Sequence, residues 1–169
     1  MMLEDLDSLL PDLYNDLKRI ARIQRNRVYS KNNLGTRSIV HEAYLNIVKN
    51  KTTIQNKNQL LFLTSNVMRN IIIDNSRAWQ AKKRGGKFHD IAIDQISLVS
   101  AQRSDEIIAL DEALDELKES NPRMVDVVTC LFFGGLTQEE TSLALNVSLA
   151  TIKRDWALSK ALLFQRLKT

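Results

Sequence analysis

The chain has 169 residues, of which 44% are hydrophobic and 26% are charged, with a net charge of +4. These proportions are typical of a folded globular protein, and only five glycines and two prolines are present, which favours helices over turn-rich sheets. No apolar run approaches the roughly 20 residues that a membrane span requires, and the acidic N-terminus is unlike a secretory signal. The single cysteine excludes a disulfide within the chain, so we expect a cytoplasmic protein.

The positive charge is concentrated in the N-terminal half. Residues 1–84 contain 15 Lys and Arg against 7 Asp and Glu, whereas residues 105–169 contain 7 against 11. The segment between them is balanced. A basic half indicates a polyanionic partner such as a nucleic acid, and the acidic half indicates either a protein partner or a plain solvated face.

Apolar spacing predicts helices throughout the N-terminal half. Between residues 3 and 20 an apolar residue recurs every three or four positions, and a second apolar stripe follows at 39–48. The longest helix is expected from Gln59 to Arg84. Its first half is apolar nearly all round and belongs at the centre of a bundle, whereas its basic second half must emerge from that core. Gly85 and Gly86 end it.

The C-terminal part shows the same helical spacing after a break. Residues 87–104 carry no sustained stripe and are expected to form a flexible linker. Asn121 followed by Pro122 is a typical helix start, because Pro fits the first helical position. The sequence therefore predicts an all-α protein with two small helical domains, residues 1–86 and 105–169. In the second domain, helices are expected at 105–118, 122–133, 137–145 and 149–166.

The most informative segment is LTQEETSLALNVSLATIKRDW, residues 136–156. Thr137 and Glu140 fit a capping box, in which each side chain satisfies a free N–H group of the other residue. Asn146 tolerates the positive φ that a tight turn requires, and Ser148 can cap the next helix. This spacing describes a helix-turn-helix, whose second helix enters a major groove. An ordinary helical hairpin with a capped start would share part of the pattern.

The second helix of this motif would present its exposed face to DNA. Lys153 and Arg154 can meet phosphates or guanine edges, and Thr151 near the helix start can touch a base or a phosphate. Trp156 either shares that face or packs as a buttress on the preceding helices, as large aromatic residues usually do. We expect the DNA-binding residues of this helix to be Ser148, Ala150, Thr151, Lys153, Arg154 and Ser159.

A second candidate nucleic-acid site lies in NVMRNIIIDNSRAWQAKKRGG, residues 66–86. Amides and arginines share this helix with an aromatic residue and a basic end, which suits single-stranded bases that are splayed out and stacked. A solvated helix end with a run of charges would look similar. The candidate DNA-binding residues are Asn66, Arg69, Asn70, Asp74, Arg77, Lys82, Lys83 and Arg84.

These segments together resemble a sigma factor of the extracytoplasmic-function (ECF) type, within the sigma-70 family of bacterial RNA polymerase subunits. The resemblance rests on VHEAYLNIV (40–48), VMRNIIIDNSRAWQAKKRGG (67–86) and LDEALDELKESNPRMVDVVTCLFFGGLTQEETSLALNVSLATIKRDWALSKALL (110–163). It covers both ends of the chain in the right order. The combination is specific, although the helix-turn-helix alone is shared with many regulators.

The resemblance implies a role for each domain. The N-terminal domain would read and melt the minus-ten promoter element, and its 40–48 helix would dock on the coiled coil of the polymerase's largest subunit. The C-terminal domain would place residues 149–159 in the minus-thirty-five major groove and contact the flap of the second-largest subunit. An anti-sigma factor is a further partner that such proteins can have. The residues implied at the polymerase contact are His41, Glu42 and Asn46, and those facing the minus-ten DNA are Asn70, Asp74, Arg77, Lys82, Lys83 and Arg84.

Two other functions compete with this one. A stand-alone helix-turn-helix regulator would dimerise and bind a palindrome without polymerase. An RNA-binding or adaptor protein would use the basic N-terminal half. The basic long helix and the HEAYL helix favour the sigma factor, because a stand-alone regulator has no use for either.

The sequence gives no support for an enzyme. It lacks a phosphate-binding glycine loop, a Ser/His/Asp set and zinc-ligand spacing, so we expect neither catalysis nor a bound cofactor or metal. The acidic residues between 111 and 119 are expected to form a solvated helix face. Cys130 is expected to be a buried small hydrophobic residue.

Overall fold

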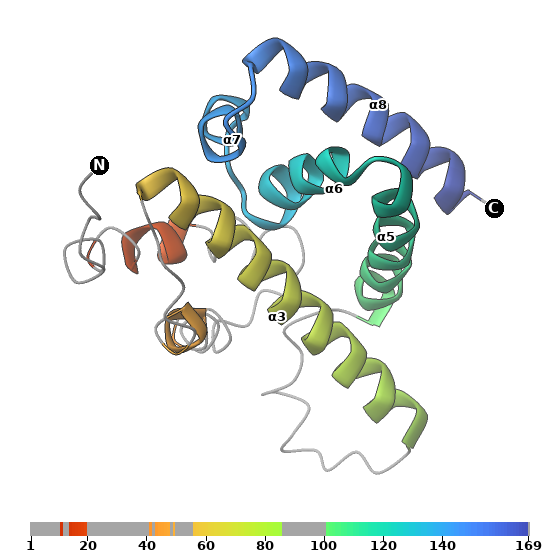
Figure 1. Ribbon diagram of the computed structural model, residues 1–169. Coiled ribbons are helices and arrows are strands. Elements are labelled where there is room, and N and C mark those ends of the chain that lie inside the picture. Colours follow the sequence, from red (N-terminus) through yellow and green to blue (C-terminus); the bar gives the residue numbers. More distant parts are fainter. Residues whose placement is uncertain are drawn as a thin grey trace.

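The computed structural model describes residues 11, 14–19, 41, 43–47, 49, 56–85 and 101–168, without the side chains of 79, 82–85 and 101–104. Every regular element in these segments is a helix, which confirms the all-α prediction for them (Figure 1). Among the described helices, none is long and apolar enough to cross a membrane. After short helical stretches at 14–19 and 43–47, the order is α3 (Lys57–Gly85), α5 (Ala101–Ser120), α6 (Pro122–Val128), the π-helix η1 (Thr129–Phe133), α7 (Gln138–Leu145) and α8 (Leu149–Leu167).

The helix boundaries follow the predicted ones closely. α5 begins at Ala101, four residues before its expected start, so it includes the end of the segment predicted as a linker. Pro122 occupies the start of α6 as predicted, but the Asn121 side chain makes no capping bond; its backbone oxygen accepts from Met124 N–H instead. Residues 86–100 lie outside the described part, so the division into two domains with a flexible linker stays a prediction.

α3 is the long central helix, with the N-terminal segments on one side and the C-terminal helices on the other (Figure 1). At its start, Asn56 Oδ1 accepts a hydrogen bond from Gln59 N–H at 2.9 Å. The buried hydroxyls of Thr64, Ser65 and Ser76 each donate to the carbonyl oxygen four residues earlier. Because these bonds satisfy the hydroxyls internally, α3 can bury this face without polar partners from other helices.

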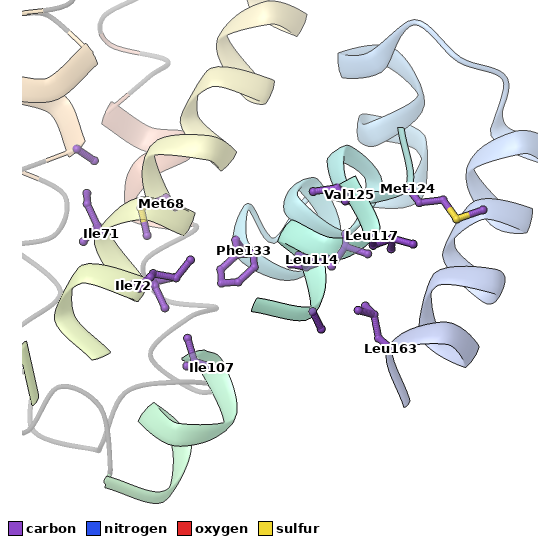
Figure 2. Packing of buried hydrophobic residues seen from close by; sticks show 14 of the residues in the cluster. Met68, Ile71, Ile72, Ile107, Leu114, Leu117, Met124, Val125, Phe133 and Leu163 are labelled. Carbon is purple, nitrogen blue, oxygen red and sulfur yellow. The ribbon is translucent and has the colours of Figure 1, made fainter. Parts of the chain in front are cut away.

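One hydrophobic cluster joins the two halves of the chain. Its buried members come from the segments near residues 17 and 43–47, from α3, and from α5, α6, η1 and α8. Figure 2 shows Ile72 of α3 on the side that faces Phe133 of η1 and Ile107 of α5. The core is therefore continuous from the N-terminal segments to the end of α8 in this conformation.

A π-helix and a glycine allow α3 to lie close to the C-terminal helices. Gly134 N–H donates to Thr129 O at 2.9 Å, the hydrogen-bond spacing of a π-helix. A Cβ at Gly134 would lie 2.0 Å from the Ser65 hydroxyl oxygen and 2.7 Å from the Ser65 Cβ. A larger residue would force α3 away, so glycine permits this contact as well as ending the helix at the predicted place.

Candidate nucleic-acid interface

The turn between α7 and α8 has the geometry that the sequence predicts. Thr137 Oγ1 accepts from Glu140 N–H at 3.0 Å and Glu140 Oε2 accepts from Thr137 N–H at 2.8 Å, so the capping box is present. Asn146 is the one described non-glycine residue with positive φ, at 53°. Ser148 Oγ then accepts from Thr151 N–H at 3.3 Å and caps α8. These bonds fix the angle at which α8 leaves α7.

The inner face of α8 is anchored to α6. Ile152 is fully buried in a cluster with Val127 and Leu131. One turn further on, Asp155 is only 2% exposed and accepts two hydrogen bonds from Arg123, at 2.6 Å to Nε and 3.3 Å to Nη2. The hydrogen bonds to Asp155, and next the attraction of its negative charge, raise the pKa of the Arg123 guanidinium. The pair was not predicted from the sequence, although Asp155 follows Ile152 at inner-face spacing.

Trp156 takes the second of its two predicted roles. It is half-buried and packs against both the main cluster and the cluster around Ile152, so it is a buttress of α8. The Lys160 ammonium lies 5.2 Å from the centre of its ring, on the exposed side. This packing holds α8 in a fixed orientation relative to α6.

The outer face of α8 is small and basic. Ala150, Lys153 and Arg154 are exposed and lie at the spacing of one helical face. Neither basic residue forms an ion pair with any described residue. Ser148 is exposed beside them, and the half-buried Thr151 hydroxyl accepts from the Ser148 hydroxyl at 2.9 Å. Five of the six residues predicted for this face are therefore at or near the surface.

The prediction that Ser159 shares this face is wrong. Ser159 is fully buried, and its hydroxyl donates to the backbone oxygen of Asp155 at 2.6 Å. It lies seven residues after Ile152, which is two turns along the same inner face. The apolar stripe that predicts a buried Ile152 also predicts a buried residue at 159, and this signal was available in the sequence.

On α3, three of the predicted residues form an exposed stripe. Asn70, Asp74 and Arg77 are exposed and lie four and three residues apart, on one face of the helix. Asn66 is half-buried, and its amide donates to Phe62 O at 3.2 Å. Residues 82–84 are helical, but the side chains of Lys82, Lys83 and Arg84 lie outside the description.

Two arginines of α3 are held by a carboxylate of α5. Arg69 Nη2 lies 2.6 Å and Arg69 Nε 3.1 Å from Asp111 Oδ1, and Arg77 Nη2 lies 3.2 Å from Asp111 Oδ2. Asp115 adds a weaker contact to Arg69 at 3.3 Å. The prediction of a solvated acidic face on α5 is therefore wrong for Asp111, whose side chain is 8% exposed, although Glu112 and its later neighbours are exposed.

Comparison with known families identifies the chain as a whole. The model of the family described as ECF sigma factor matches residues 4–169. The chain belongs to the ECF sigma factor family. It is accordingly a subunit that associates with core RNA polymerase and promoter DNA to start transcription, and it is not an enzyme. Comparisons with curated proteins and with solved structures found no match.

The segment of this sigma factor that was predicted to bind polymerase is partly described. His41 is exposed and Asn46 is half-buried, while Ala43 and Ile47 point into the core. The helix thus has the inner and outer faces that its pattern predicts. Glu42 lies outside the described residues.

An apolar groove on this sigma factor was not predicted from its sequence. It has a volume of about 550 Å³ and lies between α5, α6 and α8. Phe164 and Leu167 of α8 line it and are exposed, Phe164 to 62%. Exposed large apolar side chains gathered at a groove are typical of protein-binding surfaces. The apolar lining includes Leu110, Val128, Phe132, Trp156, Leu163 and Phe164.

Proposed function

We propose that this ECF sigma factor directs core polymerase to promoters by reading two DNA elements with two separate helices. The outer face of α8 reads the minus-thirty-five element in the major groove, and the exposed face of α3 reads the minus-ten element. The main support is the turn at Asn146, because it joins two capped helices at the spacing of a helix-turn-helix and leaves Lys153 and Arg154 uncommitted.

The composition of the α8 face suits a major groove. Ala150 near the helix start is small enough to let the helix approach base edges closely, and its methyl group can contact a thymine methyl. Arg154 can donate two hydrogen bonds to guanine, whereas Lys153 suits a phosphate. The capped N-terminus adds the positive end of the helix dipole near the DNA backbone.

The α3 face suits melted DNA. Bases that are flipped out of a duplex cost a few kcal/mol of unstacking, which contacts in the protein must offset. Amide and guanidinium groups, such as those of Asn70 and Arg77, can hydrogen-bond the exposed edges of bases as well as phosphates. The basic end at Lys82, Lys83 and Arg84 would hold the adjacent backbone.

Polymerase holds the two readers in place in this proposal. His41, Glu42 and Asn46 would dock on the coiled coil of its largest subunit, and the groove beside α8 would receive the flap of its second-largest subunit. Two weak DNA contacts on one rigid body bind far more tightly than either alone, because the second contact becomes intramolecular. Residues 1–86 and 105–169 would act as the two domains. Because the protein would act on bacterial RNA polymerase, it would work in the cytoplasm.

The proposal is tested by run-off transcription. Purified protein and core polymerase are added to templates recovered with polymerase that carries this subunit, and each template is then altered separately at its minus-ten or minus-thirty-five element. We expect transcripts only when both proteins and both elements are present. Tight and specific binding to a palindrome without polymerase would instead support a stand-alone regulator, and preference for structured RNA would support an RNA-binding protein.

A further inference from the structure

Arg69 and Arg77, the two arginines of α3 that the sequence predicts at a DNA site, are occupied by an internal partner. Asp111 Oδ1 accepts two hydrogen bonds from Arg69, and Asp111 Oδ2 accepts one from Arg77, so both oxygens of one carboxylate are used. The Arg69 guanidinium also lies 5.9 Å from the centre of the Phe133 ring. A carboxylate and a phosphate bind a guanidinium in the same geometry, so Asp111 occupies the donors that promoter DNA would use.

Other contacts close the same interface. Arg19, at the end of the helical segment 14–19, pairs with Glu140 of α7 at 2.8 Å. Gln80 of α3 donates to Asp105 of α5, and Ser65 of α3 meets Gly134 after η1. α3 thus contacts α5, η1 and α7 along most of its length. In this closed conformation the long helix lies directly on the part of the chain that carries α8.

The closed conformation is incompatible with reading both promoter elements. Elements at minus ten and minus thirty-five are about 25 base pairs apart, which is roughly 85 Å along B-DNA. A compact chain of this length has a radius of gyration of about 15 Å. α3 and α8 must therefore separate before they reach their two elements at once.

We propose that the closed conformation is a resting state in which Asp111 acts as a latch, withholding Arg69 and Arg77 from DNA until polymerase separates α3 from α5. This inference rests on the proposed role of α3. In the free protein, promoter DNA must compete with Asp111 for the two guanidiniums. In the holoenzyme the two helices are held apart, so the competition is gone.

Cys130 provides a native reporter of the latch. It is the only cysteine of the chain, it is fully buried, and it shares a cluster with Leu61 of α3. Burial, partly offset by a hydrogen bond with Ser65, raises the pKa of its thiol to about 12. When α3 leaves, Cys130 loses this cover, so its rate of alkylation by iodoacetamide measures opening.

The first experiment measures that rate in the free, full-length protein. Asp111→Asn should raise alkylation roughly tenfold, the factor expected when charged hydrogen bonds are lost. Glu112→Gln is the matched control, because it removes the same charge from an exposed site on the same helix. Arg77→Gln removes the more exposed of the two arginine partners and should give a smaller rise in the alkylation rate. It keeps the test possible if circular dichroism shows that Asp111→Asn does not fold. Unchanged rates in both latch variants would overturn the proposal.

The second experiment measures binding to a single-stranded minus-ten oligonucleotide, taken from promoters recovered with the holoenzyme. Free Asp111→Asn protein should bind roughly tenfold more tightly than Glu112→Gln protein, whereas the two holoenzymes should bind equally. An equal gain in affinity in the holoenzyme would indicate a general charge effect. That result would overturn the latch but not the proposed role of α3. If holoenzyme with Arg69→Ala and Arg77→Ala reads its minus-ten element normally, the role of α3 fails, and the latch fails with it.

Discussion

Arginines on the two proposed DNA-reading helices are in opposite electrostatic states. Arg154 on α8 is exposed and forms no ion pair with a described residue, whereas Arg69 on α3 is largely buried against Asp111. A guanidinium must be free to pair with a phosphate or a base. In our proposal, Arg154 is therefore available to DNA in the free protein, whereas Arg69 becomes available only after its ion pair with Asp111 breaks.

Arg154→Ala should weaken recognition of the minus-thirty-five element. We expect a loss of about 1–3 kcal/mol in promoter affinity of the holoenzyme, because one bidentate base contact contributes about that much. The measurement is a filter-binding or mobility-shift titration at fixed salt concentration. Lys118→Ala is the control, since it removes the same charge from an exposed position at the end of α5, away from α8. Binding to core polymerase should stay intact, and an equal loss of core binding would contradict the assignment.

Among the helices, the α7–α8 hairpin depends most on local chemistry. Its capping box, its left-handed turn residue and its second cap all lie within 12 residues, between Thr137 and Ser148. Each bond joins groups at most a few positions apart, so the sequence alone is enough to predict them. The angle of α8 relative to α6 instead depends on Ile152 and on the Arg123–Asp155 pair, which join distant residues.

Asn146→Ala should destabilise this hairpin. Alanine has no side-chain oxygen to stabilise the left-handed conformation, which costs roughly 1–2 kcal/mol for a residue with a Cβ. Asn146→Gly is the matched control and should leave the free energy of unfolding unchanged or slightly higher. Urea denaturation followed by circular dichroism measures both. Equal stability of the two variants would show that the turn conformation at residue 146 does not limit the fold.

The capping box should also give a pH dependence. Burial disfavours the charged form of Glu140, but bonds from Thr137 and the neighbouring Arg19 outweigh it and lower the pKa of Glu140 below its ordinary 4.5. A lowered carboxylate pKa stabilises the fold above that ordinary value, and the contribution is lost as the pH falls through the folded-state pKa.

The melting temperatures of wild type and Glu140→Gln should therefore differ more at neutral pH than at about pH 3. We expect an effect of no more than about 1 kcal/mol, because the Glu140 side chain is still partly exposed to solvent. Glu139→Gln, a neighbouring exposed carboxylate, serves as the control. A difference that is the same at both pH values would contradict the role of the ionised carboxylate.

At the scale of the whole molecule, one core holds the closed form together while the outer surface stays available to partners. The core runs from Leu17 to Leu163 through α3. The groove beside α8 lies on the outside of this core and is rimmed by exposed apolar side chains. In our proposal, the free protein therefore presents the groove beside α8 to polymerase while α3 is still covered by the C-terminal helices.

Phe164→Glu should weaken binding to core polymerase roughly tenfold, since an aromatic anchor at an interface commonly contributes that much. Its thermal stability should change little, because Phe164 is already mostly exposed. Gln165→Glu introduces the same charge at the next exposed position and should bind normally. Co-purification with core enzyme and fluorescence titration measure the effect. Equal weakening in both variants would point to charge repulsion rather than to the groove.

Residue patterns were enough to predict the helices, most of their ends and the turn at Asn146, because these depend on apolar periodicity and on bonds between residues a few positions apart. It also placed Ile152 inside and Lys153 and Arg154 outside, since helical spacing assigns faces. The same rule predicts the buried Ser159 when it is carried two turns further along the stripe.

The ion pairs between helices could not be predicted from the residue patterns, because they depend on how distant helices pack. Asp111 lies four residues after Ile107 and three before Leu114, so helical spacing predicts that it is on the inner face of α5, but it does not indicate which residues it meets there. Its partners Arg69 and Arg77 are 42 and 34 positions away, and they reach it because α3 packs on α5. Gly134 meets Ser65 for the same reason. Contacts at such separations depend on how the helices pack, and helical periodicity carries no information about that.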